Sequence, residues 1–171
     1  MDFKDIPQFP LSTYSTDVGW NYLKVWIEEI NSYKTNKLEL DPEYQRGYVW
    51  TPAQQIAYVE YKLRGGRSAG DLYFNCNSWG TDYTDPLELL DGKQRLNAVL
   101  AFLNNEIPAF GTLYKDFTGK LSQFTRFHVH ILKLGSPVEV VKWYLAFNTG
   151  GSIHTETDLA PAFNLLKKLE C

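Results

Sequence analysis

The sequence has little cysteine, no long apolar run and only a small excess of negative charge. Its 171 residues include two cysteines, Cys76 and Cys171, too few for the disulfide framework that staples small secreted domains. No apolar stretch approaches the ~18 residues that a membrane-spanning helix needs. The opening residues, MDFKDIPQFP, lack the apolar core region of a secretory signal. We therefore expect a soluble cytoplasmic protein with free thiols, with Cys76 buried and inert, and no membrane partner.

The overall charge is close to balanced. A formal net charge of −3 at pH 7 argues against a protein that coats nucleic acid by bulk positive charge, but it leaves room for a local basic patch. Hydrophobic residues make up 44% of the chain, which is enough for a core, and no linker rich in serine or glycine divides it. We expect an N-terminal arm over residues 1–14 and a single domain over residues 15–171.

Helical and strand patterns alternate along the chain. Apolar spacing and capping residues predict helices over residues 15–33, 52–64, 93–104 and 137–148, and a partly helical stretch over 152–170 that Pro161 limits. Short apolar or alternating runs predict strands over residues 36–41, 71–76, 86–90 and 127–134. A few strands alternating with helices favour a mixed α/β or α+β domain with a partly open sheet.

Residues 90–98, LDGKQRLNA, join a predicted strand to a predicted helix. A helix N-terminus carries unpaired backbone N–H groups and the positive end of the helix dipole, and a glycine there lets a ligand approach closely. Such a corner binds phosphate readily. Lys93 and Arg95 add positive charge, Asp91 is able to hold a divalent cation, and Gln94 is able to orient a water or a base edge. A simple solvated turn is the competing interpretation.

Three further features have two interpretations each. His128 and His130 share one face of a predicted strand, which suits a metal ion, although structural or surface histidines more often give this pattern. Trp50 would either stack on a base or anchor its loop to the core. Basic residues around a helix end would form either a patch for the DNA backbone or an ordinary solvated surface. These basic residues are Arg46, Lys62, Arg64 and Arg67.

The motifs resemble those of a known family. Gly92, Arg95 and Ala98 form G-x-x-R-x-x-A, which resembles the nucleotide-binding box of the ParB/sulfiredoxin superfamily. DGKQR more closely resembles the D-G-Q-Q-R signature of the branch that includes the N-terminal domain of GmrSD-type restriction enzymes and SspE-type phage-defence proteins. PEYQRGYVWTPAQQIAYVEYKLRGG resembles the first block of that family and FNTGG its later asparagine–glycine block. The resemblance implies an α+β domain, ParB/sulfiredoxin-like, with a small mixed sheet surrounded by helices.

Family members bind nucleoside triphosphates and often hydrolyse them, in several cases together with DNA cleavage or sensing of DNA modification. The resemblance therefore implies one nucleotide pocket built from three groups of matching residues. These groups are Tyr44, Gln45 and Arg46; Asp91, Gly92, Gln94 and Arg95; and Asn148, Gly150 and Gly151. His154 lies near the third group and would serve as a general base or a phosphate contact. Lys93 replaces the first glutamine of the signature and would add charge beside the phosphates.

The leading hypothesis is hydrolysis of a nucleoside triphosphate bound with magnesium or another divalent cation. Arg95 and Lys93 would stabilise the transferring phosphoryl group, and Asp91 would hold the metal or orient water. Gln45, Gln94 and Asn148 would position the phosphates and the attacking water.

Three alternatives stay open. They are DNA nicking, phosphoryl transfer to DNA or a small acceptor, and a non-catalytic module that senses nucleotide or DNA. Larger relatives carry an HNH-type nuclease domain that this sequence lacks, so we expect any nuclease activity to come from this domain itself or from a partner chain. A homodimer is equally compatible with the sequence.

Overall fold

The computed structural model describes residues 12–33, 37–149 and 156–170, together with Asp2, Ile6 and Pro10; Glu156 is described by its backbone alone. A mixed sheet has the strand order β1-β5-β3-β4-β2. Its strands are β1 (Tyr14–Gly19), β2 (Leu38–Glu39), β3 (Asp71–Asn75), β4 (Leu87–Asp91) and β5 (Arg126–Leu132). The pairs β3–β5 and β2–β4 are parallel, whereas β1–β5 and β3–β4 are antiparallel.

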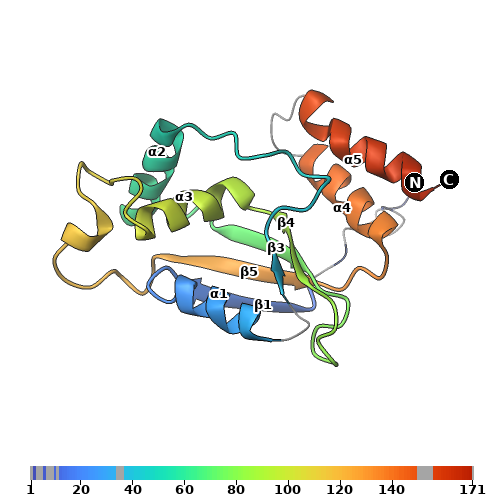
Figure 1. Ribbon diagram of the computed structural model, residues 1–171, viewed down its shortest axis with the longest axis horizontal. Helices are drawn as coiled ribbons and strands as arrows, with labels where there is room; N and C mark the ends of the chain where they lie inside the picture. Colours follow the sequence, from blue (N-terminus) through green and yellow to red (C-terminus); the bar gives the residue numbers. More distant parts are fainter. Residues whose placement is uncertain are drawn as a thin grey trace.

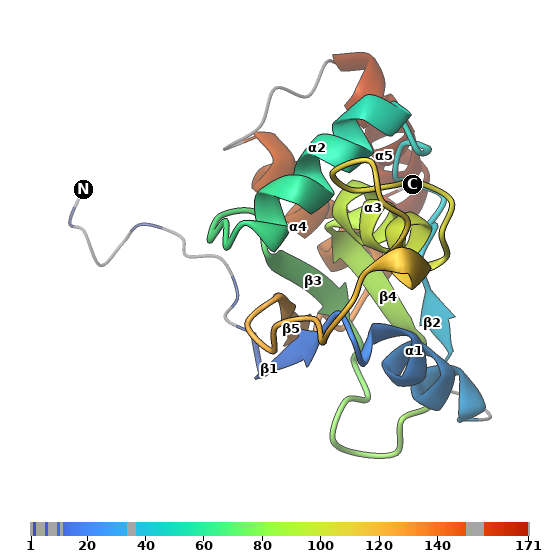
Figure 2. The same ribbon diagram turned by 90° about the vertical axis from the view of Figure 1, so that its left-hand side faces the viewer.

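Helices surround this sheet, which confirms the predicted α+β fold (Figure 1). They are α1 (Leu23–Ser32), α2 (Pro52–Leu63), α3 (Lys93–Leu103), α4 (Pro137–Thr149) and α5 (Glu156–Leu169), with a short 3-10 helix, η2 (Tyr114–Asp116). Helices α2 and α3 lie side by side, and α4 and α5 form a second pair (Figures 1 and 2). Among the described residues, no helix has both the length and the apolar character that crossing a membrane requires.

The two faces of the sheet bury different cores because successive strand residues point to opposite sides. Leu72 and Phe74 of β3 are fully buried in the core shared with α1, α2 and α3. Tyr73, between them, packs on the other face against Trp143 and Phe147 of α4, with ring centroids 5.6 and 4.9 Å apart. Helices α4 and α5 therefore pack on the second face of the sheet.

The prediction that the first helix begins at residue 15 is wrong. Residues 14–19 form strand β1 in antiparallel register with β5, and helix α1 begins only at Leu23. The apolar spacing at Leu23, Trp26 and Ile30 lies entirely within the observed helix, so it carried no information about the residues before it. Strand β1 also includes Tyr14, the last residue of the predicted arm.

The prediction that Pro161 limits the last helix is also wrong. Helix α5 continues through Pro161 to Leu169. Proline lacks the N–H group that would bond to the carbonyl of Thr157, and its ring crowds that carbonyl; together these effects cost about 3 kcal/mol or more inside a helix. Burial of Leu159 and Ala162 in the core shared with α4 opposes that cost.

Candidate functional site

Strand β4 and helix α3 meet at a tight corner centred on Gly92. Gly92 is the N-cap of α3 with φ of 107°, a conformation that favours glycine. A Cβ atom at this position would lie closer than 3.0 Å to Cδ2 of the buried Leu72. No side chain caps α3 and its first turn contains no acidic residue, so its N-terminus is open to an anion.

A cavity of about 190 Å³ opens at this corner. It brings together eight of the residues that the sequence predicted for the nucleotide pocket. These eight are Gln45, Arg46, Asp91, Gly92, Lys93, Gln94, Arg95 and Asn148. Gly150, Gly151 and His154 lie outside the described residues.

Two groups hold the Arg95 guanidinium in place, and they occupy only some of its hydrogen-bond donors. Its Nη2 donates to the backbone carbonyl of Asp71 at 2.9 Å and pairs with the Asp91 carboxylate. Within the described part of the chain, the buried Nε has no hydrogen-bond partner and Nη1 makes no hydrogen bond. The remaining capacity of a fixed guanidinium suits an anion such as phosphate.

Lys93 and Gln94 direct their side chains to the loop before α2. The Lys93 ammonium pairs with Asp41 and donates to the carbonyl of Arg46 at 2.9 Å. The Gln94 carboxamide accepts from the backbone N–H groups of Val49 and Trp50 and donates to the carbonyl of Gly47. Both side chains therefore hold the cavity wall in position. Lys93 also adds a positive charge to the cavity lining.

The other wall residues are anchored in the same way. Gln45 donates to the carbonyls of Leu89 and Leu90 at the end of β4. Arg46 pairs through Nη1 with Asp158 of α5 at 2.9 Å, and Asn148 donates to the carbonyl of Tyr144 one helical turn earlier.

Tyr44 does not line this cavity. Only 3% of the residue is exposed, and its ring packs edge-on against Tyr144, with centroids 5.1 Å apart. Burial, with the neighbouring Glu88 carboxylate, raises the pKa of Tyr44 well above its ordinary value. The tyrosine of the first block therefore faces a different cavity from the glutamine and arginine that follow it.

The predicted basic patch is broken up by burial. Lys62 is 7% exposed, and burial lowers its pKa. The guanidinium of Arg64 lies over the ring of Phe110, 5.0 Å from its centroid, and Arg67 is exposed. Because Arg46 lines the cavity and pairs with Asp158, the four residues do not present one exposed basic surface.

Histidine and tryptophan candidates also have protein partners. His128 pairs with Asp17, and His130 lies between Asp71 and the hydroxyl of Ser15. No group of three or more metal-ligating side chains is found within the described residues. Trp50 lines the cavity and also packs against the ring of Tyr58, 5.4 Å away.

Asp41 and Asp158 lie outside the cavity lining but pair with residues of the site, and sequence reasoning missed both. Each neutralises a cation of the cavity, Lys93 in one case and Arg46 in the other. Neither aspartate belongs to a motif, and each lies far along the chain from its partner, so no local pattern could have found the two pairs.

The molecule is thus an α+β domain with a polar cavity at a strand-to-helix corner, lined by three basic residues that each pair with an aspartate. A family model described as the N-terminal domain of the GmrSD restriction endonuclease matches residues 27–163, and the chain belongs to this family. This match confirms the resemblance drawn from the DGKQR corner, and it supports a restriction- or defence-related role in DNA processing. Neither a search of curated proteins nor a search of solved structures found a match.

Proposed function

We propose that this domain binds a nucleoside triphosphate with magnesium and hydrolyses it, in the service of restriction or defence. The open N-terminus of α3 carries the proposal, because it faces a cavity lined by Arg46, Lys93 and Arg95. Backbone N–H groups and cations in this arrangement attract phosphate. At about 190 Å³ the cavity is smaller than the about 300–1,000 Å³ that encloses a whole drug-sized ligand, so it suits the phosphate groups rather than the entire nucleotide.

Arg95 has the central role in this proposal. Its guanidinium, fixed by the Asp71 carbonyl, stabilises the negative charge on the transferring phosphoryl group without having to reorganise. Arg46 binds the phosphates, with Gly92 permitting their approach to the backbone. Gln94 and Gln45 hold the wall that supplies Arg46, and Asn148 contributes its carboxamide oxygen to the position of the attacking water.

Magnesium fits this cavity as an ion that accompanies the nucleotide. Protein sites often hold magnesium through one or two carboxylates together with substrate phosphates. Asp91 is the one carboxylate among the described lining residues, and its partner Arg95 would share it with the metal. When bound, the magnesium ion would neutralise part of the negative charge on the phosphates. In the third block, Gly150 and Gly151 would close the pocket, as the family resemblance implies, and His154 would serve as a general base or a phosphate contact.

Phosphate release from ATP, GTP, CTP and UTP with magnesium tests the proposal. We expect Arg95→Ala to lower kcat by about 10²–10³-fold, the usual effect of deleting one donor to a developing negative charge. Arg126→Ala is the matched control, because Arg126 also pairs with an aspartate, Asp17, but lies outside the cavity. Circular dichroism establishes that both variants are folded.

The alternatives give different results in the same assay. Equal release by the native chain and Arg95→Ala would place the chemistry elsewhere. Nucleotide binding without release would favour a sensor, and release only with added DNA or a small acceptor would favour phosphoryl transfer. Relaxation of supercoiled plasmid without nucleotide would favour nicking.

A further inference from the structure

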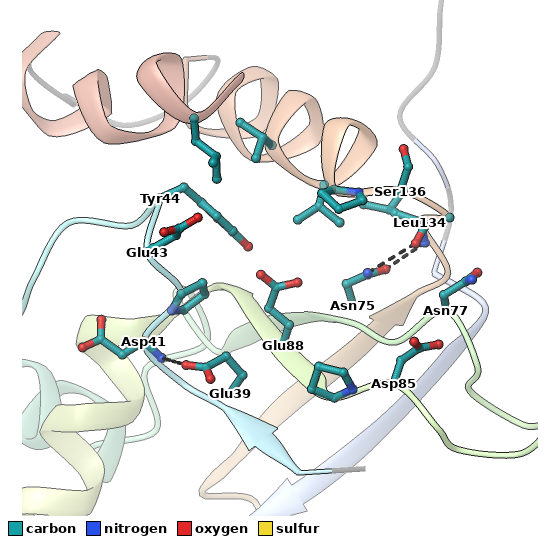
Figure 3. Close-up of a pocket in the computed structure, with 17 residues that line it drawn as sticks. Glu39, Asp41, Glu43, Tyr44, Asn75, Asn77, Asp85, Glu88, Leu134 and Ser136 are labelled. Atoms are coloured by element: carbon teal, nitrogen blue, oxygen red, sulfur yellow. Dashed lines mark hydrogen bonds between the residues drawn. The ribbon is translucent and has the colours of Figure 1, made fainter. Parts of the chain in front are cut away.

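A second cavity, of about 510 Å³, lies on the same side of the sheet as α4 and α5 (Figure 3). We call it the acidic groove. Its floor is a row of side chains from three adjacent strands, because Glu88 of β4 is paired in register with Glu39 of β2 and Asn75 of β3. The start of α4 and the loop that carries Tyr44 form its walls.

Negative charge dominates the acidic groove. Five carboxylates line it, and no lysine, arginine or histidine is among the described residues that do so. These carboxylates belong to Glu39, Asp41, Glu43, Asp85 and Glu88. In the described part of the chain only Asp41 pairs with a cation, Lys93, which belongs to the neighbouring cavity. Like charges at opposed strand positions repel, so Glu39 and Glu88 leave an unfavourable potential that a cation would relieve.

Tyr44 adds a buried polar group beside the carboxylates. Its hydroxyl is buried, makes no hydrogen bond of ordinary geometry within the described part of the chain, and points into the acidic groove towards the Glu88 carboxylate, with which it interacts (Figure 3). A buried hydroxyl without a partner is costly, and a tyrosine oxygen is able to accept a hydrogen bond. A donor placed beside Tyr44 and Glu88 would give both oxygens a hydrogen bond of ordinary geometry.

The opposite wall is apolar. Val140 and Val141 of α4 and Leu165 of α5 face the cavity across from the carboxylates. A ligand that fits both walls has a compact cationic head and a hydrocarbon stem. An ammonium group has three N–H donors on a small centre, which matches a tyrosine oxygen and a carboxylate side by side.

We propose that the acidic groove binds an aliphatic ammonium group, carried either by a free polyamine or by a lysine side chain of a protein segment. The stem lies along the valines of α4, and the ammonium donates to Tyr44 and Glu88. This site is separate from the phosphate cavity and needs no nucleotide.

Calorimetric titration of the full chain, without nucleotide, tests the proposal with two probes. One is 1,4-diaminobutane and the other is the capped peptide acetyl-Lys-Lys-Lys-amide; 1,4-butanediol is the neutral counterpart of the diamine. We expect saturable binding of at least one cationic probe, none of the diol, and weaker binding as sodium chloride is added. Preference for the diamine would identify a free polyamine as the source, and preference for the peptide a protein segment.

Variants tie the binding to the groove. We expect Glu88→Gln to weaken binding about tenfold or more, because the ammonium loses its charged acceptor, and Tyr44→Phe to weaken it severalfold. Glu28→Gln removes one exposed carboxylate outside the groove and should leave affinity unchanged. Absence of binding by both cationic probes would overturn the proposal. Equal losses in Glu88→Gln and Glu28→Gln would do the same, because they would reveal only general attraction to an acidic protein.

Discussion

Replacing Gly92 with alanine tests how the phosphate-binding corner is built. The φ of 107° places the residue where a Cβ atom costs about 1–2 kcal/mol. The added methyl group would also approach Leu72, a fully buried side chain, to less than 3.0 Å, and overpacking of this kind costs about 1–3 kcal/mol. We expect a total loss of about 2–5 kcal/mol, which in a chain of this size lowers Tm by about 4–20 °C.

Two other glycines separate these contributions. Gly65 has φ of +86°, but a methyl group added there would have no neighbouring atom within 4 Å, so Gly65→Ala carries the backbone cost alone. Gly47 has neither a positive φ nor a neighbour within 4 Å, and Gly47→Ala should be neutral or slightly stabilising. The expected order of destabilisation is Gly92→Ala, then Gly65→Ala, then Gly47→Ala.

Thermal and urea unfolding followed by circular dichroism measure the three variants under one set of conditions. A loss in Gly92→Ala no larger than that in Gly65→Ala would refute the role of the Leu72 contact. A loss as small as that in Gly47→Ala would refute the left-handed corner itself. Nucleotide titration of Gly92→Ala, carried out well below its Tm, then shows separately whether the methyl group also blocks phosphate.

Two further predictions concern stability. Thr51→Ala removes the side-chain acceptor of the capping box with Gln54, and urea unfolding should show a loss of about 1 kcal/mol; an unchanged midpoint would mean that the cap does not stabilise α2. Burial, opposed in part by Tyr44 and reinforced by Glu39, raises the pKa of Glu88 above its ordinary 4.5, so the folded state favours the protonated carboxyl and loses stability as the pH rises through the raised pKa. Glu88→Gln should therefore have a higher Tm than the native chain at pH 8, with the difference shrinking towards pH 4.5; a constant difference would contradict this reasoning.

Much of the local structure could be predicted because it depends on neighbouring residues. Thr51, Pro52 and Gln54 predict the start of α2, and the structure contains the complete capping box. The corner at Gly92 follows from an apolar run, a glycine and a helical pattern in sequence, and strand, N-cap and helix lie there in that order.

Features that depend on distant partners could not be predicted. Strand β1 exists because residues 14–19 pair with β5, more than a hundred residues later, and its own sequence has no strong strand pattern. The charge of Lys93 was evident from the sequence, but its direction is set by Asp41, 52 residues earlier. The acidic groove collects carboxylates from separate loops and strands, so no window of the sequence contains it.

The ion pair between Asp41 and Lys93 connects the two cavities, since Asp41 lines one and Lys93 the other. An amine that attracts Asp41 would release part of the Lys93 charge towards the phosphates, whereas phosphates that attract Lys93 would free Asp41 for the amine. Thermodynamic linkage requires the two effects to be equal. If the amine raises the affinity for nucleotide by some factor, the nucleotide raises the affinity for the amine by the same factor. If both proposed ligands bind, this one salt bridge would couple their affinities.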